Sequence, residues 1–138
     1  MKNKFQIILL LGILLITFTT CGIAGQSPTD VLKAYHSAIK ANKFQEVASY
    51  LSSINSAYAP MVGMSGSTAN LQWAVKISKY TNDDVEKWDY LGEQIKGEEA
   101  IVRYRVYLKN KTQPQESFRK LIKEKGDWKV VVEGAPLY

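Results

Sequence analysis

Cysteine and histidine are nearly missing from this sequence of 138 residues, which contains one of each. A single cysteine excludes a disulfide within the chain, and it excludes zinc and iron–sulfur sites that take several thiolate ligands from one chain. A single histidine excludes imidazole-rich metal sites. The sequence also lacks a Gly-rich phosphate loop and a nucleophile elbow. We therefore expect no metal and no cofactor.

A strong excess of charge is missing as well. Removing Lys2 and Lys4, which lie in a segment that we expect to be cleaved, lowers the formal net charge from +5 to +3. Residues 96–129 hold ten Lys or Arg, but five Asp or Glu lie among them. Such mixing is typical of a solvated sheet face and not of a surface that follows a phosphate backbone. We expect no nucleic-acid partner, and the 46% hydrophobic content indicates one folded domain.

The N-terminal segment has the order of an export signal. Lys2 and Lys4 precede an apolar run over residues 5–18, and small or hydroxylated residues follow it. As a helix this run of about fourteen residues would span roughly 21 Å, which is shorter than the ~30 Å hydrocarbon core of a membrane. We predict that residues 1–20 are a signal peptide that is removed.

Cys21 follows this run and precedes Gly22, an arrangement that resembles a bacterial lipoprotein signal. The resemblance implies that Cys21 becomes the lipidated first residue, residues 21–26 a short tether, and residues 27–138 the folded domain. Several acyl chains on one cysteine give a stable membrane anchor. The implied location is the cell envelope, with the membrane as a partner through Cys21. The alternative is a soluble secreted protein that is cleaved after Ala24.

Helical periodicity dominates the first half of the domain. Ser27 as N-cap, Pro28 at the first position and Asp30 in the first turn predict the start of a helix. Its apolar stripe consists of Val31, Leu32, Tyr35, Ala38 and Ile39. A second stripe, which predicts a short helix after a sharp turn, consists of Phe44, Val47, Ala48 and Leu51. Residues 69–80 predict a third helix, and Asp83 and Asp84 indicate a turn after it.

Residues 52–68, between the second and third helices, are rich in Ser, Gly and Asn and predict a loop. We expect Met61 and Met64 to pack this loop on the core as a flap. A mobile lid over a pocket is the alternative.

Strand periodicity replaces helical periodicity from residue 85 onward. Residues 99–109 alternate between an apolar face and a mostly polar face, which is typical of a half-buried antiparallel strand. Residues 85–95, 116–123 and 127–133 predict three further strands, joined at Gly97 and Gly126 turns. The predicted fold is α+β, with three N-terminal helices packed on a curved four-stranded antiparallel meander.

The chain resembles the nuclear transport factor 2-like superfamily. The resemblance is carried by the order of elements, by S-P-T-D-V-L-K-A-Y and F-Q-E-V-A-S-Y-L, by E-E-A-I-V-R-Y-R-V-Y and by the closing K-G-D-W-K-V-V-V. Within that superfamily it resembles small bacterial lipoproteins with a lumazine-binding-like domain. The resemblance implies a conical fold whose sheet curls around a pocket, and it implies no single activity.

Aromatic side chains are the main candidates for binding a ligand inside such a cone. Trp88 and Tyr90 are expected inward on the first strand, and Tyr104 is expected inward on the second. Tyr35 and Trp73 on the helices complete a candidate cavity for a flat or apolar ligand. Filling of the core by the same five rings is the alternative. Trp128, in G-D-W-K, is expected to be a structural plug.

Catalytic candidates are scarce. Related enzymes, such as ketosteroid isomerases and dehydratases, need an inward acid or histidine together with a group that stabilises an oxyanion. We expect His36, next to the buried stripe, to touch solvent, and Glu116, which shares a strand face with Phe118, Lys120 and Ile122, to lie near solvent. The sequence shows no pair of a base and a residue that orients it. These two residues are therefore kept only as the alternative catalytic candidates.

We therefore expect a non-catalytic, lipid-anchored domain that binds a small apolar or aromatic ligand or an envelope protein. The first alternative is a lyase or isomerase that uses His36 or Glu116. The second is an immunity-type protein-binding module that uses the outer face of the sheet, where Ile101, Arg103, Arg105 and Tyr107 lie.

Overall fold

The computed structural model of the protein describes residues 25–55 and 68–132. In these ranges three helices precede a four-stranded antiparallel sheet whose strands pair in chain order. The helices are α1 (Pro28–Lys40), α2 (Phe44–Tyr50) and α4 (Ala69–Asp84), and the strands are β1 (Val85–Lys96), β2 (Glu99–Leu108), β3 (Gln115–Glu124) and β4 (Asp127–Val130). The prediction of an α+β chain with helices before a meander is confirmed.

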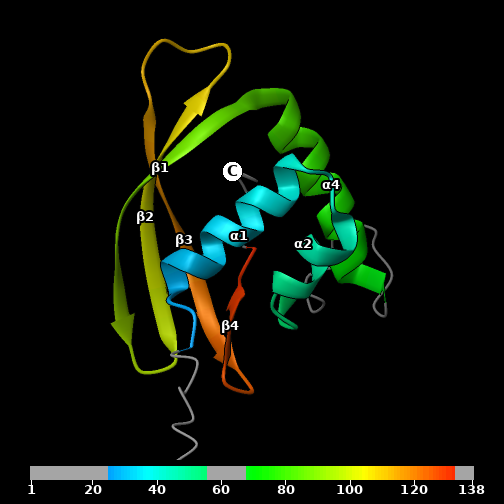
Figure 1. Ribbon diagram of the computed structural model, residues 1–138, viewed down its shortest axis with the longest axis vertical. Helices are drawn as coiled ribbons and strands as arrows, with labels where there is room; N and C mark the ends of the chain where they lie inside the picture. Colours follow the sequence, from blue (N-terminus) through cyan, green and yellow to red (C-terminus); the bar gives the residue numbers. More distant parts are fainter. Residues whose placement is uncertain (1–24, 56–67, 133–138) are drawn as a thin grey trace, which may run out of the picture.

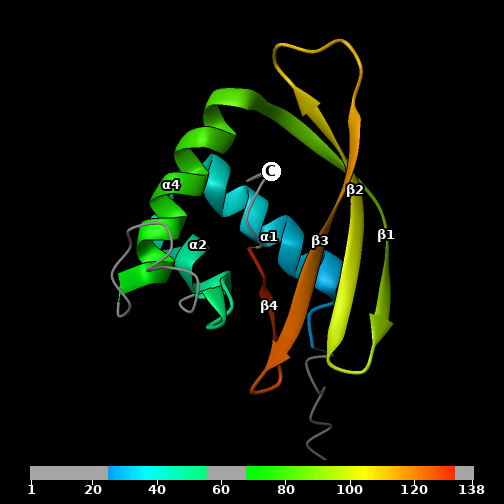
Figure 2. The same ribbon diagram turned by 180° about the vertical axis from the view of Figure 1, so that it is seen from behind.

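The sheet curves around α1, and α2 and α4 lie on the other side of that helix (Figures 1 and 2). β1 continues directly from the end of α4, arches over α1 and pairs with β2 from Val85 onward. We call the sheet face toward α1 the inner face and the opposite one the outer face. The core lies between the inner face and the helices, with Leu32, Ile39, Val102 and Leu121 among its fully buried members.

The start of α1 agrees with its sequence signals. The Ser27 side chain accepts a hydrogen bond from the Asp30 backbone N–H at 3.1 Å, which satisfies one of the free donors at a helix N-terminus. The helix ends in a sharp turn because Asn42 adopts a φ of 54°, a left-handed conformation that Asn tolerates better than most residues. α2 then begins at Phe44, close to the predicted position.

α4 is longer than predicted. Asp83 and Asp84 do not form a turn after the helix but its last residues, and the chain passes directly into β1. Acidic residues at a helix C-terminus oppose the helix dipole. Cations from other elements compensate, because Lys109 Nζ donates to the Asn82 carbonyl at 2.6 Å and Lys40 Nζ donates to the Val85 carbonyl.

A bulge interrupts the pairing of β1 with β2 between Tyr90 and Gly92, where Gly92 has a φ of 137°. Before the bulge Trp88 and Tyr90 face inward, as predicted, and pack against the core. After it Glu93 lies opposite the inner-face residue Val102 and accepts a hydrogen bond from the Thr29 backbone N–H at 2.8 Å. The hydrogen bond of Glu93, just after the bulge, thus connects β1 to the N-terminus of α1.

β2 has the predicted alternation, and its buried residues are Ala100, Val102, Tyr104, Val106 and Leu108. β4 is shorter than predicted and ends at Val130 instead of continuing to residue 133. Beyond that point the Val131 N–H still donates to the Lys120 carbonyl of β3 at 3.0 Å. The neighbouring backbone groups bond to the buried Asn55 side chain instead: Nδ2 donates to the Val130 carbonyl and Oδ1 accepts from the Val132 N–H.

Several predictions concern residues outside the described ranges: the signal peptide over residues 1–20, the lipidation of Cys21, and the packing of Met61 and Met64. They stay predictions. None of the helices in the described ranges combines the length and the apolar character needed to cross a membrane.

Candidate functional site

Six side chains meet on the inner face of the sheet, where it curves around α1. Tyr35 and His36 come from α1, Trp88 and Tyr90 from β1, Tyr104 from β2 and Arg119 from β3. We call these six residues the His36 cluster. Three of its members are aromatic residues predicted to face inward on β1 and β2, and the structure brings them together with Tyr35.

His36 is the centre of the cluster. It is 3% exposed, so the expectation that it touches solvent is wrong. Its ring is stacked on Trp88 with centroids 4.1 Å apart and an interplanar angle of 8°, and Tyr104 meets it edge-on at 5.6 Å. The Nδ1 atom of His36 and the hydroxyl of Tyr90 share a hydrogen bond of 2.7 Å. His36 is therefore held by one stacked ring, one edge-on ring and a hydrogen bond at one nitrogen.

The imidazole of His36 is neutral in the folded protein at neutral pH. Burial lowers its pKa well below the ordinary value of 6.5, and the charge of Arg119 lowers it further. Burial also raises the pKa of Tyr35 to about 12, although Arg119 acts in the opposite direction. Arg119 is consequently the source of positive charge in a cluster whose other members are uncharged.

Arg119 was not predicted as an inner-face residue. On β3 we considered only the face that Glu116 shares with Phe118, Lys120 and Ile122, and Phe118 is 62% exposed on the outer face. The register decides the matter, because Tyr104 lies opposite Ser117 and Ala100 lies opposite Leu121. Ser117, Arg119 and Leu121 therefore face inward.

The sequence contains a signal that would have placed Arg119 correctly. The turn at Lys125 and Gly126 pairs Glu124 with Asp127, and it follows that Leu121 pairs with Val130. Trp128 and Val130 are the alternating apolar residues of β4, so their partners on β3 must face inward as they do, and Arg119 lies two residues before Leu121.

Three polar atoms of the His36 cluster have no hydrogen-bond partner within residues 25–55 and 68–132. They are the Tyr104 hydroxyl, the Trp88 Nε1 and the Arg119 Nε. Tyr104 is 0% exposed and Arg119 is 7% exposed. Buried polar groups in folded proteins are nearly always paired, and four further unpaired ones lie on α4, at Asn70, Trp73, Ser78 and Thr81. The three of the cluster differ from these because they share one wall with stacked rings and a buried arginine. Such a wall is suited to binding hydrogen-bonding groups that the described residues do not supply.

Glu116, the second catalytic candidate, lies away from this cluster. It is exposed on the outer face, where Arg105 Nη2 lies 3.2 Å and Arg103 Nη2 lies 3.4 Å from its carboxylate oxygens. The same face has a shallow hollow of about 270 Å³ that is lined by Ile101, Arg103, Glu116, Ser117 and Phe118. Ile101 and Arg103, two residues of the predicted protein-binding face, thus adjoin an exposed phenyl ring.

Trp73 does not join the cluster either. It is buried on α4, with the ammonium group of Lys76 5.6 Å from its ring centroid, and its Nε1 has no partner among the described residues. No ring contact in the described part of the chain connects it to His36. Trp73 is therefore part of the helical core, and the predicted five-residue cavity loses this member.

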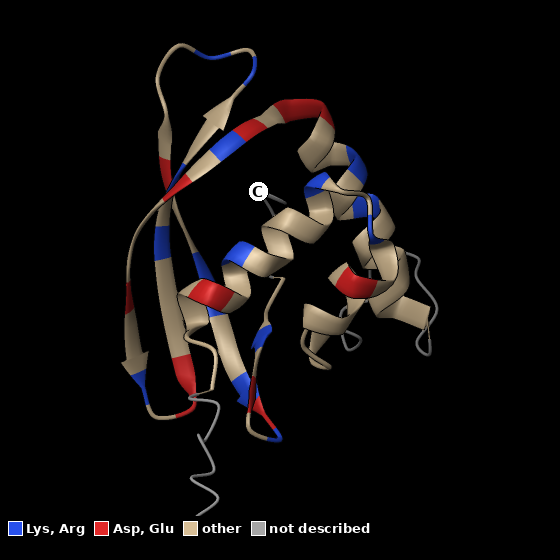
Figure 3. Ribbon diagram, viewed as in Figure 1, with Lys and Arg blue, Asp and Glu red and all other residues tan. Residues whose placement is uncertain are grey.

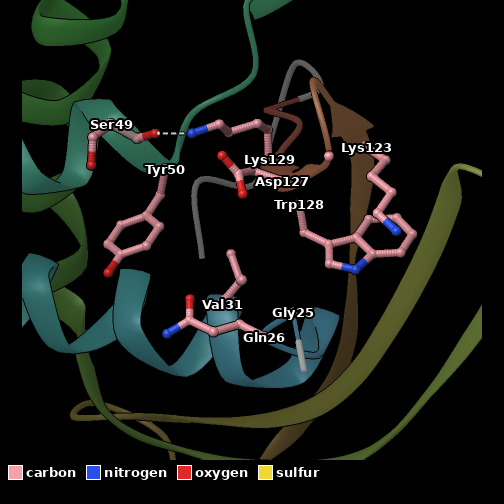
Figure 4. A pocket seen from close by; sticks show the side chains of 10 residues that line it. Gly25, Gln26, Val31, Ser49, Tyr50, Lys123, Asp127, Trp128 and Lys129 are labelled. Carbon is pink, nitrogen blue, oxygen red and sulfur yellow. Dashed lines mark hydrogen bonds between the residues drawn. The ribbon is translucent and has the colours of Figure 1, made fainter. Parts of the chain in front are cut away.

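A separate groove of about 650 Å³ lies between the start of α1, the end of α2 and the β3–β4 hairpin. Figure 4 shows Val31, Tyr50, Lys129 and Trp128 around it, with Lys129 donating a hydrogen bond to the Ser49 carbonyl. Trp128 is buried at the edge of this groove, as predicted for a plug between the last hairpin and the helices. Its indole also contacts Lys123, whose ammonium lies 5.4 Å from the ring.

Charged residues of both signs are spread along the helices and the strands (Figure 3). The absence of a nucleic-acid partner stays a prediction. In residues 25–55 and 68–132 no three His, Cys, Asp or Glu side chains are grouped as metal ligands would be.

Comparison with solved structures identifies the fold. A provisional nuclear transport factor 2-like transpeptidase from Campylobacter jejuni has a TM-score of 0.56 with 17% identity, over 78% of this chain and 100% of the other. A SEC-C motif containing protein from Rhodopseudomonas palustris has a TM-score of 0.55 with 12% identity, over 80% and 79% of the two chains. No protein-family model and no curated protein matches the sequence. The chain thus has the nuclear transport factor 2-like fold, and at these identities the likeness concerns the fold alone.

Proposed function

We propose that the protein is an exported, lipid-anchored domain that binds a small ligand with a flat apolar part at the His36 cluster, without catalysing a reaction. The observation that carries this proposal is the wall of stacked rings in which three polar atoms lack a partner among the described residues. Ring faces favour a flat apolar group, and the unpaired atoms are available to orient it. The sequence resemblance to small bacterial lipoproteins supports the same proposal.

The anchor part of the proposal rests on Cys21. Gly25 and Gln26 lie directly before the N-cap of α1, so about six residues connect the lipid to the domain. At ~3.3 Å per residue this tether reaches about 20 Å at most. The domain would stay beside the membrane surface, and the ligand would come from the envelope.

The anchor is tested by metabolic labelling with a clickable fatty acid. Wild-type protein should be labelled and lie in the membrane fraction, whereas Cys21→Ala and Cys21→Ser should lose the label. The mass of the mature wild type should correspond to an acylated chain beginning at Cys21. If the wild type is unlabelled and its mass corresponds to a chain that begins at residue 25, the result would support the alternative cleavage after Ala24 and contradict the anchor.

Ligand binding is tested by native mass spectrometry of the full chain purified from its host. Wild-type protein should carry an additional small mass that Trp88→Ala loses, because this change removes the ring stacked on His36. The matched control is Phe118→Ala, which truncates an exposed ring on the outer face and should keep the mass. If Trp88→Ala and Phe118→Ala retain the ligand equally, the cluster is not the site.

One observation favours a second function, proton transfer by a lyase or isomerase. A neutral, buried histidine that is held at 2.7 Å by the Tyr90 hydroxyl has the character of an oriented general base. His36→Gln separates the two functions. A binding protein should keep its retained ligand with this change, while an enzyme should accumulate unconverted substrate in place of product.

A further inference from the structure

Three charged residues lie on the inner face: Glu93, Arg119 and Lys123. Arg119 is the buried one, and its position is fixed by the sheet. It lies opposite Val102 in the β2–β3 ladder, two residues beyond Ser117, which lies opposite Tyr104. Arg119 and Tyr104 are therefore diagonal neighbours on the inner face. Arg119 is 7% exposed on the face that packs against α1, so its side chain lies between the sheet and that helix, where its charge acts on Tyr35 and His36.

This guanidinium has no acidic partner in the described part of the chain. The ion pairs there are Lys43–Glu46, Arg103–Glu116, Arg105–Glu116 and Lys120–Glu99. None of them includes Arg119, although its exposure of 7% is far lower than that of the paired arginines. A buried charge without a counter-charge is costly, and arginine does not escape the cost by losing its proton. An anion at this place would offset the cost.

The surroundings of Arg119 restrict which anion fits. The buried Tyr104 hydroxyl, unpaired among the described residues, offers a second donor on the same face. His36, Trp88 and Tyr90 add rings without negative charge. A guanidinium beside a hydroxyl is suited to a carboxylate or a similar oxyanion, because its planar fork donates two parallel hydrogen bonds. The rings are suited to a flat apolar body attached to that group.

We propose that the ligand of the His36 cluster is a small organic monoanion whose oxyanion is bound by Arg119 and Tyr104 and whose flat body lies against Trp88 and Tyr90, the partly exposed rings of the cluster. This inference rests on the proposed function and specifies its ligand class. It would make the site selective against neutral molecules of the same shape, since a neutral molecule leaves Arg119 buried without a counter-charge.

The test compares two probes of equal shape, 2-naphthoate and its neutral amide 2-naphthamide, by titration calorimetry on the full chain as its host processes it. Wild-type protein should bind the carboxylate more tightly by roughly tenfold or more, the scale of a charge-assisted hydrogen bond. Arg119→Met should reduce this preference to about one while 2-naphthamide still binds. Arg103→Met, which removes the same charge from the outer face, should leave the preference unchanged.

Each other outcome overturns a defined part. Equal binding of the two probes by wild-type protein, or a preference that persists in Arg119→Met, overturns the monoanion inference and leaves the proposed function standing. Binding of neither probe overturns both. If Arg119→Met does not fold, Arg119→Lys, which keeps the charge but loses the fork, should bind the carboxylate more weakly and the amide equally well. Coupling of Arg119→Met with Glu133→Gln in a double-mutant cycle would mean that the chain supplies its own carboxylate, which also overturns the inference.

Discussion

Asn55 and the His36 cluster are two buried polar regions that differ in whether the chain supplies hydrogen-bond partners for them. Asn55 is 0% exposed, and the chain pairs both ends of its amide: Nδ2 donates to the Val130 carbonyl at 3.1 Å and Oδ1 accepts from the Val132 N–H at 2.9 Å. Tyr104 is equally buried, yet its hydroxyl has no partner within the described residues. The same holds for the Nε of Arg119.

The difference separates a polar group that serves the fold from one that serves something else. A buried polar group stabilises a fold when its partners are in the chain, and it destabilises the fold when they are not. Asn55 holds the end of β4 against the segment after α2, where Leu51 forms a parallel bridge with Val130. The unpaired groups around His36 form no such bond within the described residues, which is why we propose a ligand for them.

The largest expected effect concerns Trp128, which lies on β4, the strand whose end Asn55 holds. Trp128→Ala should lower the free energy of unfolding by about 3–5 kcal/mol, because it removes a buried indole from the contact of the last hairpin with the helices. Denaturant unfolding measures the loss, and Phe118→Ala on the exposed outer face is the control, with an expected loss within about 0.5 kcal/mol. A loss below about 1 kcal/mol for Trp128→Ala would mean that this end of the sheet is not tightly packed.

Asn55→Ala tests the paired member of the comparison. The change leaves the Val132 N–H without its acceptor, whereas the Val130 carbonyl keeps the Ser52 N–H at 2.8 Å. We expect a loss of about 2 kcal/mol in the free energy of unfolding. Asn110→Ala, at an exposed position, is the matched control and should change little. Equal stability of the two variants would remove the structural role of Asn55.

Sequence patterns predicted the His36 cluster better than they predicted the role of Asn55. Alternation on β2 placed Tyr104 inward, and the parity of β1 placed Trp88 and Tyr90 beside it, because strand periodicity is a local property. His36 shares the helical face of Leu32 and Ile39, four residues after one and three before the other, so its burial was also accessible. We assigned it to the edge because the width of the buried face depends on how far the sheet curves around α1, which no local pattern contains.

Long-range relations account for the other errors. Arg119 was missed because β3 was read alone, where Phe118 and Ile122 outnumber Leu121 as apolar residues. The pairing with β4 fixes the opposite parity. Asn55 lies in a segment predicted as a loop, and its role depends on Val130 and Val132, which are distant in sequence. Trp73 is buried as expected of a tryptophan, but its place on α4 separates it from the sheet, and composition contains no information on this.

The pH dependence of stability distinguishes the two regions, because only the His36 cluster contains a buried titratable base. The pKa of His36 is lowered in the folded state by burial and by Arg119, whereas the unfolded chain has a pKa near 6.5. Below that pH the unfolded state therefore binds a proton that the folded state does not bind. Stability should fall as the pH decreases from 6.5, by at most about 1.4 kcal/mol per pH unit.

Denaturant unfolding at a series of pH values between about 5 and 7.5 measures this slope, at values where carboxyl groups contribute less. His36→Asn should flatten it, and Asn55→Ala should keep it despite its lower stability. If wild-type protein and His36→Asn have the same slope, His36 is not the buried neutral base that the structure shows.

The smallest expected effect on stability, and the one most specific to the comparison, belongs to Tyr104→Phe. Removing a buried hydroxyl that has no partner in the described chain removes a desolvation cost and leaves the ring in place, so the free energy of unfolding should stay constant or rise by up to about 1 kcal/mol. Asn55→Ala should change it in the opposite direction. A loss of more than about 1 kcal/mol would mean that the hydroxyl is paired in the free protein, and the contrast between the two regions would disappear. The same variant should bind a copurified ligand about tenfold more weakly, near 1.4 kcal/mol, because the ligand then loses its hydrogen bond with the hydroxyl while the fold loses none. Stability that is maintained while affinity falls is the combination that a group reserved for a ligand produces, and a group that serves the fold does not produce it.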